Sequence, residues 1–254
     1  MPENAKVHIL ENKKWYGLVT VVLVLLIVSI SLYEMGYRFK GDLTLGKLGQ
    51  LSMSISLPLT SIFIDQSEKI TTTKDNETIT LPFSPTKHSV IISHDGYFPW
   101  KKDFVIESNK TLNLFPIFVS QNATGEIITK NDPDYLRIRN GLVTVPSPDK
   151  LTPLFSVDKS ASIWLEDNAV MAKIGDKIIN VIQPDTIVRN LSFYKDRSDV
   201  VMFSTLGSVF VIEIDEKGNQ NFMPVYRGQK PLFMKTDSSF IYVLDGEVLM
   251  QVVI

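Results

Sequence analysis

The chain contains three histidines and no cysteine, so it has no thiolate metal ligand and no cysteine nucleophile. His88 and His94 lie close together in the sequence, and Asp95 is the only further ligand beside them, while a protein metal site needs at least three. His8 precedes a long apolar segment. The chain also lacks a Gly-x-Ser-x-Gly elbow. The sequence therefore predicts neither a metal site nor a nucleophilic active site, with His88 and His94 as surface residues near turns.

Acidic residues form three clusters that could in principle supply the paired carboxylates of a glycosidase. The clusters are Asp132-Pro-Asp134, Glu166-Asp167 and the trio Glu213, Asp215 and Glu216. A glycosidase needs two carboxylates about 5–10 Å apart across a cleft. Each cluster lies at or beside a predicted turn, where acids usually serve solubility. We therefore predict that catalytic residues are absent, and a hydrolase stays the alternative.

A group of aromatic residues around one turn is the better lead to a binding function. Tyr97, Phe98 and Trp100 lie next to the turn signal His94-Asp95-Gly96. Aromatic rings on a loop can stack on sugars or anchor a protein partner. The alternative is that Tyr97 and Trp100 cover one end of a β-sandwich core or pack on the next domain. Tyr97, Phe98 and Trp100 are the candidate binding surface.

Composition excludes some partners. The net charge is −2, the pI is about 6.0, and lysine and arginine are scattered without a basic stripe. Nucleic-acid binding therefore has no electrostatic support. The chain contains neither Gly-x-Gly-x-x-Gly nor a P-loop, so no phosphate-bearing cofactor is expected and the predicted cofactor set is empty.

An uncharged run from Trp15 to Tyr33 predicts where the protein is held. A helix of this length covers about 28 Å, close to the hydrocarbon thickness of a bilayer. Aromatic residues flank both ends, as they do at membrane interfaces. A cleaved signal peptide is the competing interpretation, with Ser29 and Ser31 as a small-x-small pattern. The run is long for a signal peptide, so we predict an uncleaved single-pass anchor.

The orientation of the anchor is inferred from the charges beside it. Three lysines precede the run and three basic residues follow it, but Lys13 and Lys14 directly abut the apolar residues. Long domains translocate largely regardless of their charge. We therefore expect the N-terminus on the cytoplasmic side of the cytoplasmic membrane and the large C-terminal part outside the cytoplasm.

Beyond the anchor, alternating apolar residues and turn signals predict a mainly β fold. Residues 51–57 and 111–115 alternate strictly, which is typical of half-buried strands. The spacing of these short strands indicates a small β-sandwich. The predicted organisation is a cytoplasmic tail (1–14), a transmembrane helix (15–35), a tether (36–48), a sandwich (49–119), a linker or degenerate blade (120–152) and repeats (153–254).

The sandwich segment resembles the PEGA domain, a small β-sandwich found on bacterial envelope proteins. The first matching piece is Ser56-Leu-Pro58, followed by a strand that ends at Asp65-Gln66. The second is Pro85-Thr86, followed by a strand and then by Gly96-Tyr97-Phe98-Pro99-Trp100, the most specific piece. Where the family has Gly-Ala or Gly, this chain has Thr60-Ser61, Gln66 and Thr86. Glycine supplies positive φ cheaply, so these turns should depart from the family.

The resemblance extends to both sides of the sandwich. An apolar helix ending in Gly36-Tyr37-Arg38-Phe39 and a later Leu114-Phe115-Pro116 strand are similar to a group of membrane-anchored PEGA proteins from small-genome bacteria. Members of that group often carry a β-propeller-like region next. The resemblance implies no established biochemical activity.

The C-terminal part overlays itself twice, without gaps, at a constant shift along the sequence. Leu154-Phe155 falls on Phe193-Tyr194 and Leu232-Phe233, and Ile163-Trp164 falls on Met202-Phe203 and Ile241-Tyr242. A period of about 40 residues, which this shift matches, is the signature of a four-stranded propeller blade. The alternative is a β-meander with evenly spaced strands. The gapless overlay favours propeller-like antiparallel repeats.

Three copies are too few for a closed propeller, which usually needs at least four blades. The last copy also ends within a strand run at Ile254, leaving an apolar face and an open edge. Three explanations stay open: a truncated chain, which is the simplest, an extra degenerate blade from Tyr135–Val145, or a second subunit that completes the ring.

The sequence thus predicts a non-enzymatic, membrane-anchored binding or scaffolding protein of the bacterial cell envelope. An envelope protein or a cell-wall glycan is the expected partner, besides the membrane itself. One alternative is an envelope glycan-acting hydrolase that uses acidic residues of the repeats. Another is a ligand sensor acting through a membrane partner, because the cytoplasmic tail is too short for a signalling domain.

Overall fold

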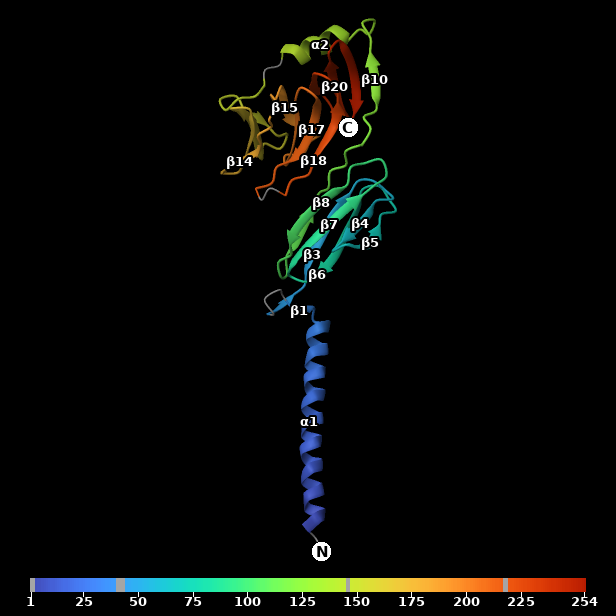
Figure 1. Cartoon of the computed structure of the whole chain (residues 1–254), viewed down its shortest axis with the longest axis vertical. Coiled ribbons are helices and arrows are strands. Elements are labelled where there is room, and N and C mark those ends of the chain that lie inside the picture. Colours follow the sequence, from blue (N-terminus) through green and yellow to red (C-terminus); the bar gives the residue numbers. More distant parts are fainter. Residues whose placement is uncertain (1–2, 40–43, 145–146, 217–218) are drawn as a thin grey trace. The chain divides into compact units, whose positions relative to one another are not determined.

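The computed structural model describes residues 3–39, 44–144, 147–216 and 219–254 (Figure 1). It confirms a mainly β fold with one N-terminal apolar helix and several antiparallel sheets. The chain divides into two compact units, which are described separately. The first contains residues up to Ser56, Asn76–His88 and Phe104–Phe115, and the second contains Leu57–Asp75, Ser89–Asp103 and Pro116–Ile254. Strands of the predicted sandwich therefore belong to both units.

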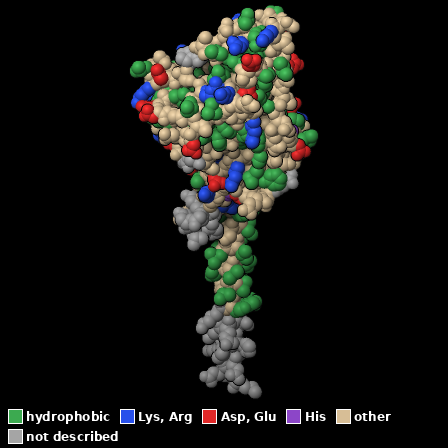
Figure 2. Space-filling view, turned by 45° about the horizontal axis from the view of Figure 1, so that its top comes forward, with side chains coloured by type: hydrophobic (Ala, Val, Ile, Leu, Met, Phe, Trp, Pro, Cys, Tyr) green, Lys and Arg blue, Asp and Glu red, His purple; other side chains and the backbone are tan. Residues whose placement is uncertain are grey.

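Helix α1 (Glu3–Glu34) contains a segment suited to a bilayer by length and composition. Trp15–Glu34 is 20 residues long with a mean hydropathy of 2.5, and none of the window is buried. Figure 2 shows hydrophobic side chains along the described part of this helix. Gly36 adopts a φ of 80° just after the last turn, which only glycine adopts cheaply. Arg38 donates to the Tyr33 carbonyl at 2.8 Å and satisfies one of the helix-end acceptors.

The predicted tether 36–48 contains a small hairpin. Strand β1 (Tyr37–Phe39) pairs antiparallel with β2 (Leu45–Lys47). The connecting residues 40–43 lie outside the described part of the chain. The segment is therefore more structured than its polar composition indicated.

A three-stranded sheet with the order β6-β3-β9 follows. Strand β3 (Gly49–Ile55) pairs antiparallel with β6 (Glu77–Phe83) and parallel with β9 (Thr111–Leu114). Leu51, Met53 and Ile55 are fully buried, while the serines between them are not. This confirms the predicted alternation and gives the sheet one apolar face.

A second sheet has the order β5-β4-β7-β8, formed by β4 (Ser61–Ile64), β5 (Ser67–Thr71), β7 (Lys87–Ser93) and β8 (Trp100–Val105). Alternate residues of β4 and β7 are buried. Asp65 and Gln66, between β4 and β5, have φ values of 50° and 67°. Two successive positive φ values are typical of a two-residue hairpin turn, which forms here without glycine.

Three four-stranded antiparallel sheets form the repeat region. Their second strands begin at Ala161, Val200 and Phe240, close to the predicted repeat spacing. The first repeat sheet contains β11 (Leu154–Phe155), β12 (Ala161–Glu166), β13 (Ala169–Ile174) and β14 (Lys177–Ile182). The second contains β15 (Asn190–Phe193), β16 (Val200–Ser204), β17 (Ser208–Glu213) and β18 (Phe222–Arg227).

The third repeat sheet takes one strand from earlier in the chain. Strands β19 (Pro231–Lys235), β20 (Phe240–Asp245) and β21 (Val248–Val253) are joined by β10 (Gly125–Ile128), which pairs with β21. The expected open edge at the last strand run is therefore wrong, because β10 covers it. A Cβ on Gly125 would lie 2.0 Å from the Gln251 carbonyl oxygen, so only glycine fits there.

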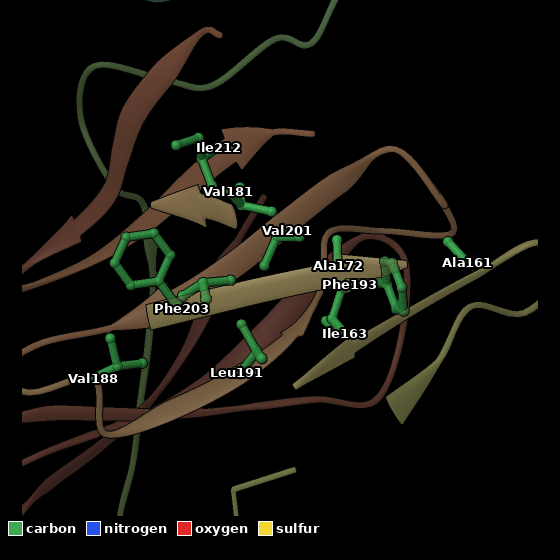
Figure 3. Packing of buried hydrophobic residues seen from close by; sticks show 11 residues of the cluster. Ala161, Ile163, Ala172, Val181, Val188, Leu191, Phe193, Val201, Phe203 and Ile212 are labelled. Atoms are coloured by element: carbon green, nitrogen blue, oxygen red, sulfur yellow. The ribbon is translucent and has the colours of Figure 1, made fainter. Parts of the chain in front are cut away.

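Apolar side chains from the first and second repeat sheets share one core (Figure 3). Ile163 and Ala172 of the first sheet and Val201 and Phe203 of the second are essentially inaccessible to solvent. The two sheets thus pack through their faces, and the shared burial stabilises both.

Helix α2 (Tyr135–Thr144) corrects two expectations. No helix was predicted after Phe39, and Tyr135–Val145 was considered for a degenerate blade; Val145 lies outside the described residues. Tyr135, Ile138 and Leu142 form one apolar stripe that packs on Leu244 and Leu249 of the third repeat sheet. The stripe spans only two turns, too few to stand out as helical periodicity among strands.

Candidate functional site

The first strands of the three repeat sheets line one open groove of about 500 Å³. They come from residues far apart in the sequence, brought together because each repeat places its first strand at the same end of its sheet. We call this hollow the repeat groove; it is lined by Leu154, Phe155, Val157, Ser192, Phe193, Asp196, Lys235, Thr236, Asp237 and Ser238.

A smaller hollow of about 170 Å³ adjoins the repeat groove and shares Leu154, Ser192 and Lys235 with it. Gly141 and Leu142 of α2 line this hollow as well. Together the two hollows present apolar, hydroxyl and charged groups, the mixture expected of a binding site.

An Asp-x-Ser turn follows each of the three first strands: Asp158-Lys-Ser160, Asp196-Arg-Ser198 and Asp237-Ser-Ser239. Asp158 accepts hydrogen bonds from the Ser156 hydroxyl at 2.7 Å and from the backbone and hydroxyl of Ser160. These bonds, led by Ser156, lower the pKa of Asp158 to about 2. Bonds from Ser239, with Lys235 nearby, similarly lower the pKa of Asp237.

Asp196 and Lys235 form an ion pair of 3.1 Å at the repeat groove. The Asp196 side chain is 64% exposed, so water and a ligand can both reach it. The positive charge of Lys235 also contributes to the lowered pKa of Asp237. The lining therefore has two carboxylates for one ammonium group and carries a small negative excess.

Side-chain bonds link successive repeats beside the groove. The Ser147 hydroxyl donates to the Arg189 carbonyl at 2.9 Å, and Arg189 donates to the Pro231 carbonyl at 3.0 Å. Asn190 donates to the Phe233 carbonyl. These bonds occupy carbonyls of β19 that would otherwise face outward from its sheet.

A second polar cluster, which we call the Lys102 network, is built differently. The Lys102 ammonium group lies 3.2 Å from the Glu213 carboxylate and 2.6 Å from Asp215, and it donates to the Asn219 carbonyl at 3.1 Å. Burial of Lys102 opposes its charge, but bonds to Asp215 and the charges of Glu213 and Asp215 outweigh it, so the pKa of Lys102 is raised. Both carboxylates lie at or just after the end of β17.

Glu213 is the most buried carboxylate of the Lys102 network, at 6% exposure. It accepts hydrogen bonds from the Trp100 indole at 2.6 Å and from the side-chain amide of Asn221 at 2.9 Å. The Asn221 amide also bonds both the N–H and the C=O of Lys101 in β8, at 2.9 Å each. The network thus joins β8 to the second repeat sheet within one compact unit.

The candidate aromatic surface is only partly available. Trp100 is 2% exposed and its indole donates to Glu213, so Trp100 is not available as part of the candidate binding surface and the alternative of a buried, packed Trp100 applies. Tyr97 and Phe98 are half-buried, and the Tyr97 ring lies edge-on to Phe118 at 6.1 Å between centroids. The sequence could not show this, because Glu213 lies far from Trp100 along the chain.

The acidic clusters are engaged in local contacts. Glu213 and Asp215 are bound by Lys102, Glu216 by Lys177, and Glu166 by Lys150. Asp132 accepts from Thr129, and Asp134 pairs with Arg137 at the start of α2. These contacts pair each of the six named carboxylates with a basic side chain or a hydrogen-bond donor. None of them is a pair facing across the repeat groove.

The histidines occupy separate surroundings. His88 is buried, which corrects its expected surface position: its Nε2 lies 3.0 Å from the Ser84 carbonyl, and Phe83 packs on its ring. His94 contacts the Asp95 carbonyl at 2.8 Å. Within the described residues, no three histidine, cysteine or acidic side chains cluster as a metal site would require.

The repeat groove was not predicted, although its signal was present. The Asp-x-Ser turn after each apolar pair recurs three times, but its two intervals are unequal, so an overlay at a constant shift misaligns it. No protein-family model matches the chain, and a search of curated proteins found no match either.

Proposed function

We propose that this chain is a single-pass membrane-anchored protein of the bacterial cell envelope with a binding or scaffolding role and no catalysis of its own. The N-terminus would lie in the cytoplasm and the β-rich part outside it. The repeat groove is the observation that carries the binding role, because its size lies within the range of known ligand sites.

The exposed apolar surface of α1 supports the anchor. Leu18, Leu25 and Ile27 are each at least 60% exposed, and the apolar window of the helix buries nothing against the described strands. Burying such side chains in lipid is favourable by about 25 cal/mol per Å² of apolar surface. A lone exposed helix of this composition would otherwise aggregate in water.

The Lys102 network supports a non-catalytic role for Glu213, the most buried member of the acidic trio. A general acid or nucleophile must reach its substrate, whereas Glu213 is buried and bound on both oxygens. We further propose that the 49–119 segment is PEGA-like and the following repeats propeller-like. Strands β4, β7 and β8 fall on the motif pieces, and the three four-stranded sheets recur close to the repeat spacing of the sequence.

The absence of native cysteine gives a clean test of topology. Ala123→Cys places a single thiol at an exposed position of the β-rich part, and Ala5→Cys is the matched variant in the N-terminal tail. In intact bacterial cells with a permeabilised outer layer, a membrane-impermeant maleimide should label the thiol at position 123 and not the one at position 5. Labelling of both only after lysis of the cytoplasmic membrane would contradict the outward orientation.

The binding role is tested in the same cells. A photo-crosslinking amino acid at Ser238, in the repeat groove, should give a discrete product, and the same group at Ala123, outside it, should not. If both positions give the same pattern or neither gives a product, the groove is not a binding site.

A further inference from the structure

Among the described residues, no strand pairs with the outer edge of β11, which lies beside the repeat groove. It is the end strand of its sheet, and it is only Leu154–Phe155 long. Ser156 N–H donates to the Ala161 carbonyl at 2.9 Å, which fixes the alternation of hydrogen-bonded pairs. Phe155 and Ser162 then form the non-hydrogen-bonded pair, so the Phe155 N–H and C=O point away from β12. An unpaired edge of this kind can accept another strand.

The first strands of the other two repeat sheets, β15 and β19, are less suited to accept a further strand. The Pro231 and Phe233 carbonyls of β19 already accept from Arg189 and Asn190. Among the strands that line the groove, β11 also has the most exposed side chains, with Phe155 at 60%. β11 is therefore the edge best placed to receive a ligand.

The two walls of the repeat groove differ in chemistry. On the β11 side Leu154 and Phe155 are joined by Val157, which is 75% exposed. On the other side lie Asp196 and Asp237 with Lys235 as their only lining counter-ion. An extended polypeptide presents alternate side chains to opposite faces, which suits one apolar and one acidic wall.

We infer that the repeat groove binds an extended polypeptide segment that adds as a strand to the β11 edge. Its apolar side chains pack on Leu154, Phe155 and Val157, and its lysine or arginine side chains pair with Asp196 and Asp237. This inference rests on the proposed binding function and names the ligand class of the same site. Main-chain bonds provide affinity, and the two walls select the alternation of apolar and basic residues.

The test uses the full-length chain in lipid nanodiscs and a phage library of randomised heptapeptides. Selections run in parallel on the wild type, on Phe155→Asp and on the control Ile178→Asp. Ile178 lies in the same repeat sheet and is also 60% exposed, but it is outside the groove. We expect the wild type and the control to enrich heptapeptides that alternate apolar and basic residues, and Phe155→Asp to enrich none. Val157→Asp repeats the test in case Phe155→Asp loses the native thermal transition.

A synthetic peptide of the enriched sequence then measures the acidic wall. The Asp196→Asn, Asp237→Asn double variant should weaken its binding about tenfold, as expected for two exposed charge pairs. N-methylation of the peptide backbone should abolish binding, whereas a lost side-chain contact alone would only weaken it.

Several outcomes would overturn the inference: no enrichment on the wild type, equal enrichment on Phe155→Asp, selection of acidic peptides, or binding indifferent to the double variant. Binding of chitotetraose that Phe155→Asp removes, without peptide binding, would assign the groove to a glycan and leave the proposed function standing. Failure of the outward labelling at position 123 would instead contradict the proposed function itself.

Discussion

The Lys102 network and the repeat groove use the same residue types in opposite ways. In the network one lysine contacts two carboxylates, and one of these, Glu213, also accepts hydrogen bonds from an indole and an amide and is almost inaccessible to water. In the groove one lysine also faces two carboxylates, but Asp196 is mostly exposed. A buried charge depends on each of its partners, whereas an exposed one can exchange them for water or a ligand. The comparison separates a structural contact from the proposed binding site.

Substituting Lys102 or Lys235, each in a separate variant, should reveal the largest difference in stability between the Lys102 network and the repeat groove. Lys102→Met leaves the buried Glu213 and the partly exposed Asp215 without their counter-ion, and breaking a buried pair in this way costs up to about 3–5 kcal/mol. Lys235→Met, in the groove, should cost at most about 1 kcal/mol because water solvates Asp196. Urea unfolding of the full-length chain in detergent measures both. Equal losses would mean that the groove pair is structural too.

Trp100 tests the next contact of the network. Trp100→Phe keeps a ring but removes the indole N–H that donates to Glu213 at 2.6 Å. Loss of one donor to a buried charge should destabilise the chain by about 1–3 kcal/mol. The matched change in the groove, Phe155→Leu, should leave the unfolding free energy within about 0.5 kcal/mol. A neutral Trp100→Phe would show that water replaces the indole.

Sequence patterns predicted the elements of the fold better than its contacts. The apolar helix, the alternation of β3 and the repeat spacing are local signals, and the structure confirms each of them. The pairing of β10 with β21 was not predictable, because the sequence of so short a strand does not identify a partner that is distant along the chain. Helix α2 was missed for the related reason that its apolar stripe is short and is completed by Leu244 and Leu249.

The candidate sites divide in the same way. Tyr97, Phe98 and Trp100 were correctly placed beside a turn, but their exposure depended on Glu213 and Phe118, which sequence distance conceals. The groove depended on three first strands meeting, and only the recurring Asp-x-Ser turn hinted at it. Local chemistry could thus be predicted, whereas the surroundings that decide its accessibility could not.

Alkaline pH should weaken the Lys102 network without a substitution, because Lys102 loses its charge there. The pKa of Lys102 is raised in the folded chain, so its contribution is fully present below the unfolded value near 10.5 and is lost as pH rises through the folded pKa. The wild type should therefore lose stability above about pH 10.5, and Lys102→Met should lose less over the same window. Thermal melts at stepped pH compare them. Parallel curves would assign the alkaline loss to other groups.

The smallest effect on stability is expected for Asp158, an exposed carboxylate in the turn after β11. The pKa of Asp158 is lowered from 3.8 to about 2, chiefly by the Ser156 hydroxyl. A lowered pKa contributes stability above the unfolded value that is lost as pH falls through the folded one. Asp158→Asn should therefore melt slightly below the wild type at pH 7, and the two curves should converge below about pH 2. Asp158 is fully exposed, so its turn does not depend on a buried partner. A loss of melting temperature as large as that of Lys102→Met would contradict this expectation. It would show that Asp158 is a structural group and not an exposed turn residue after β11.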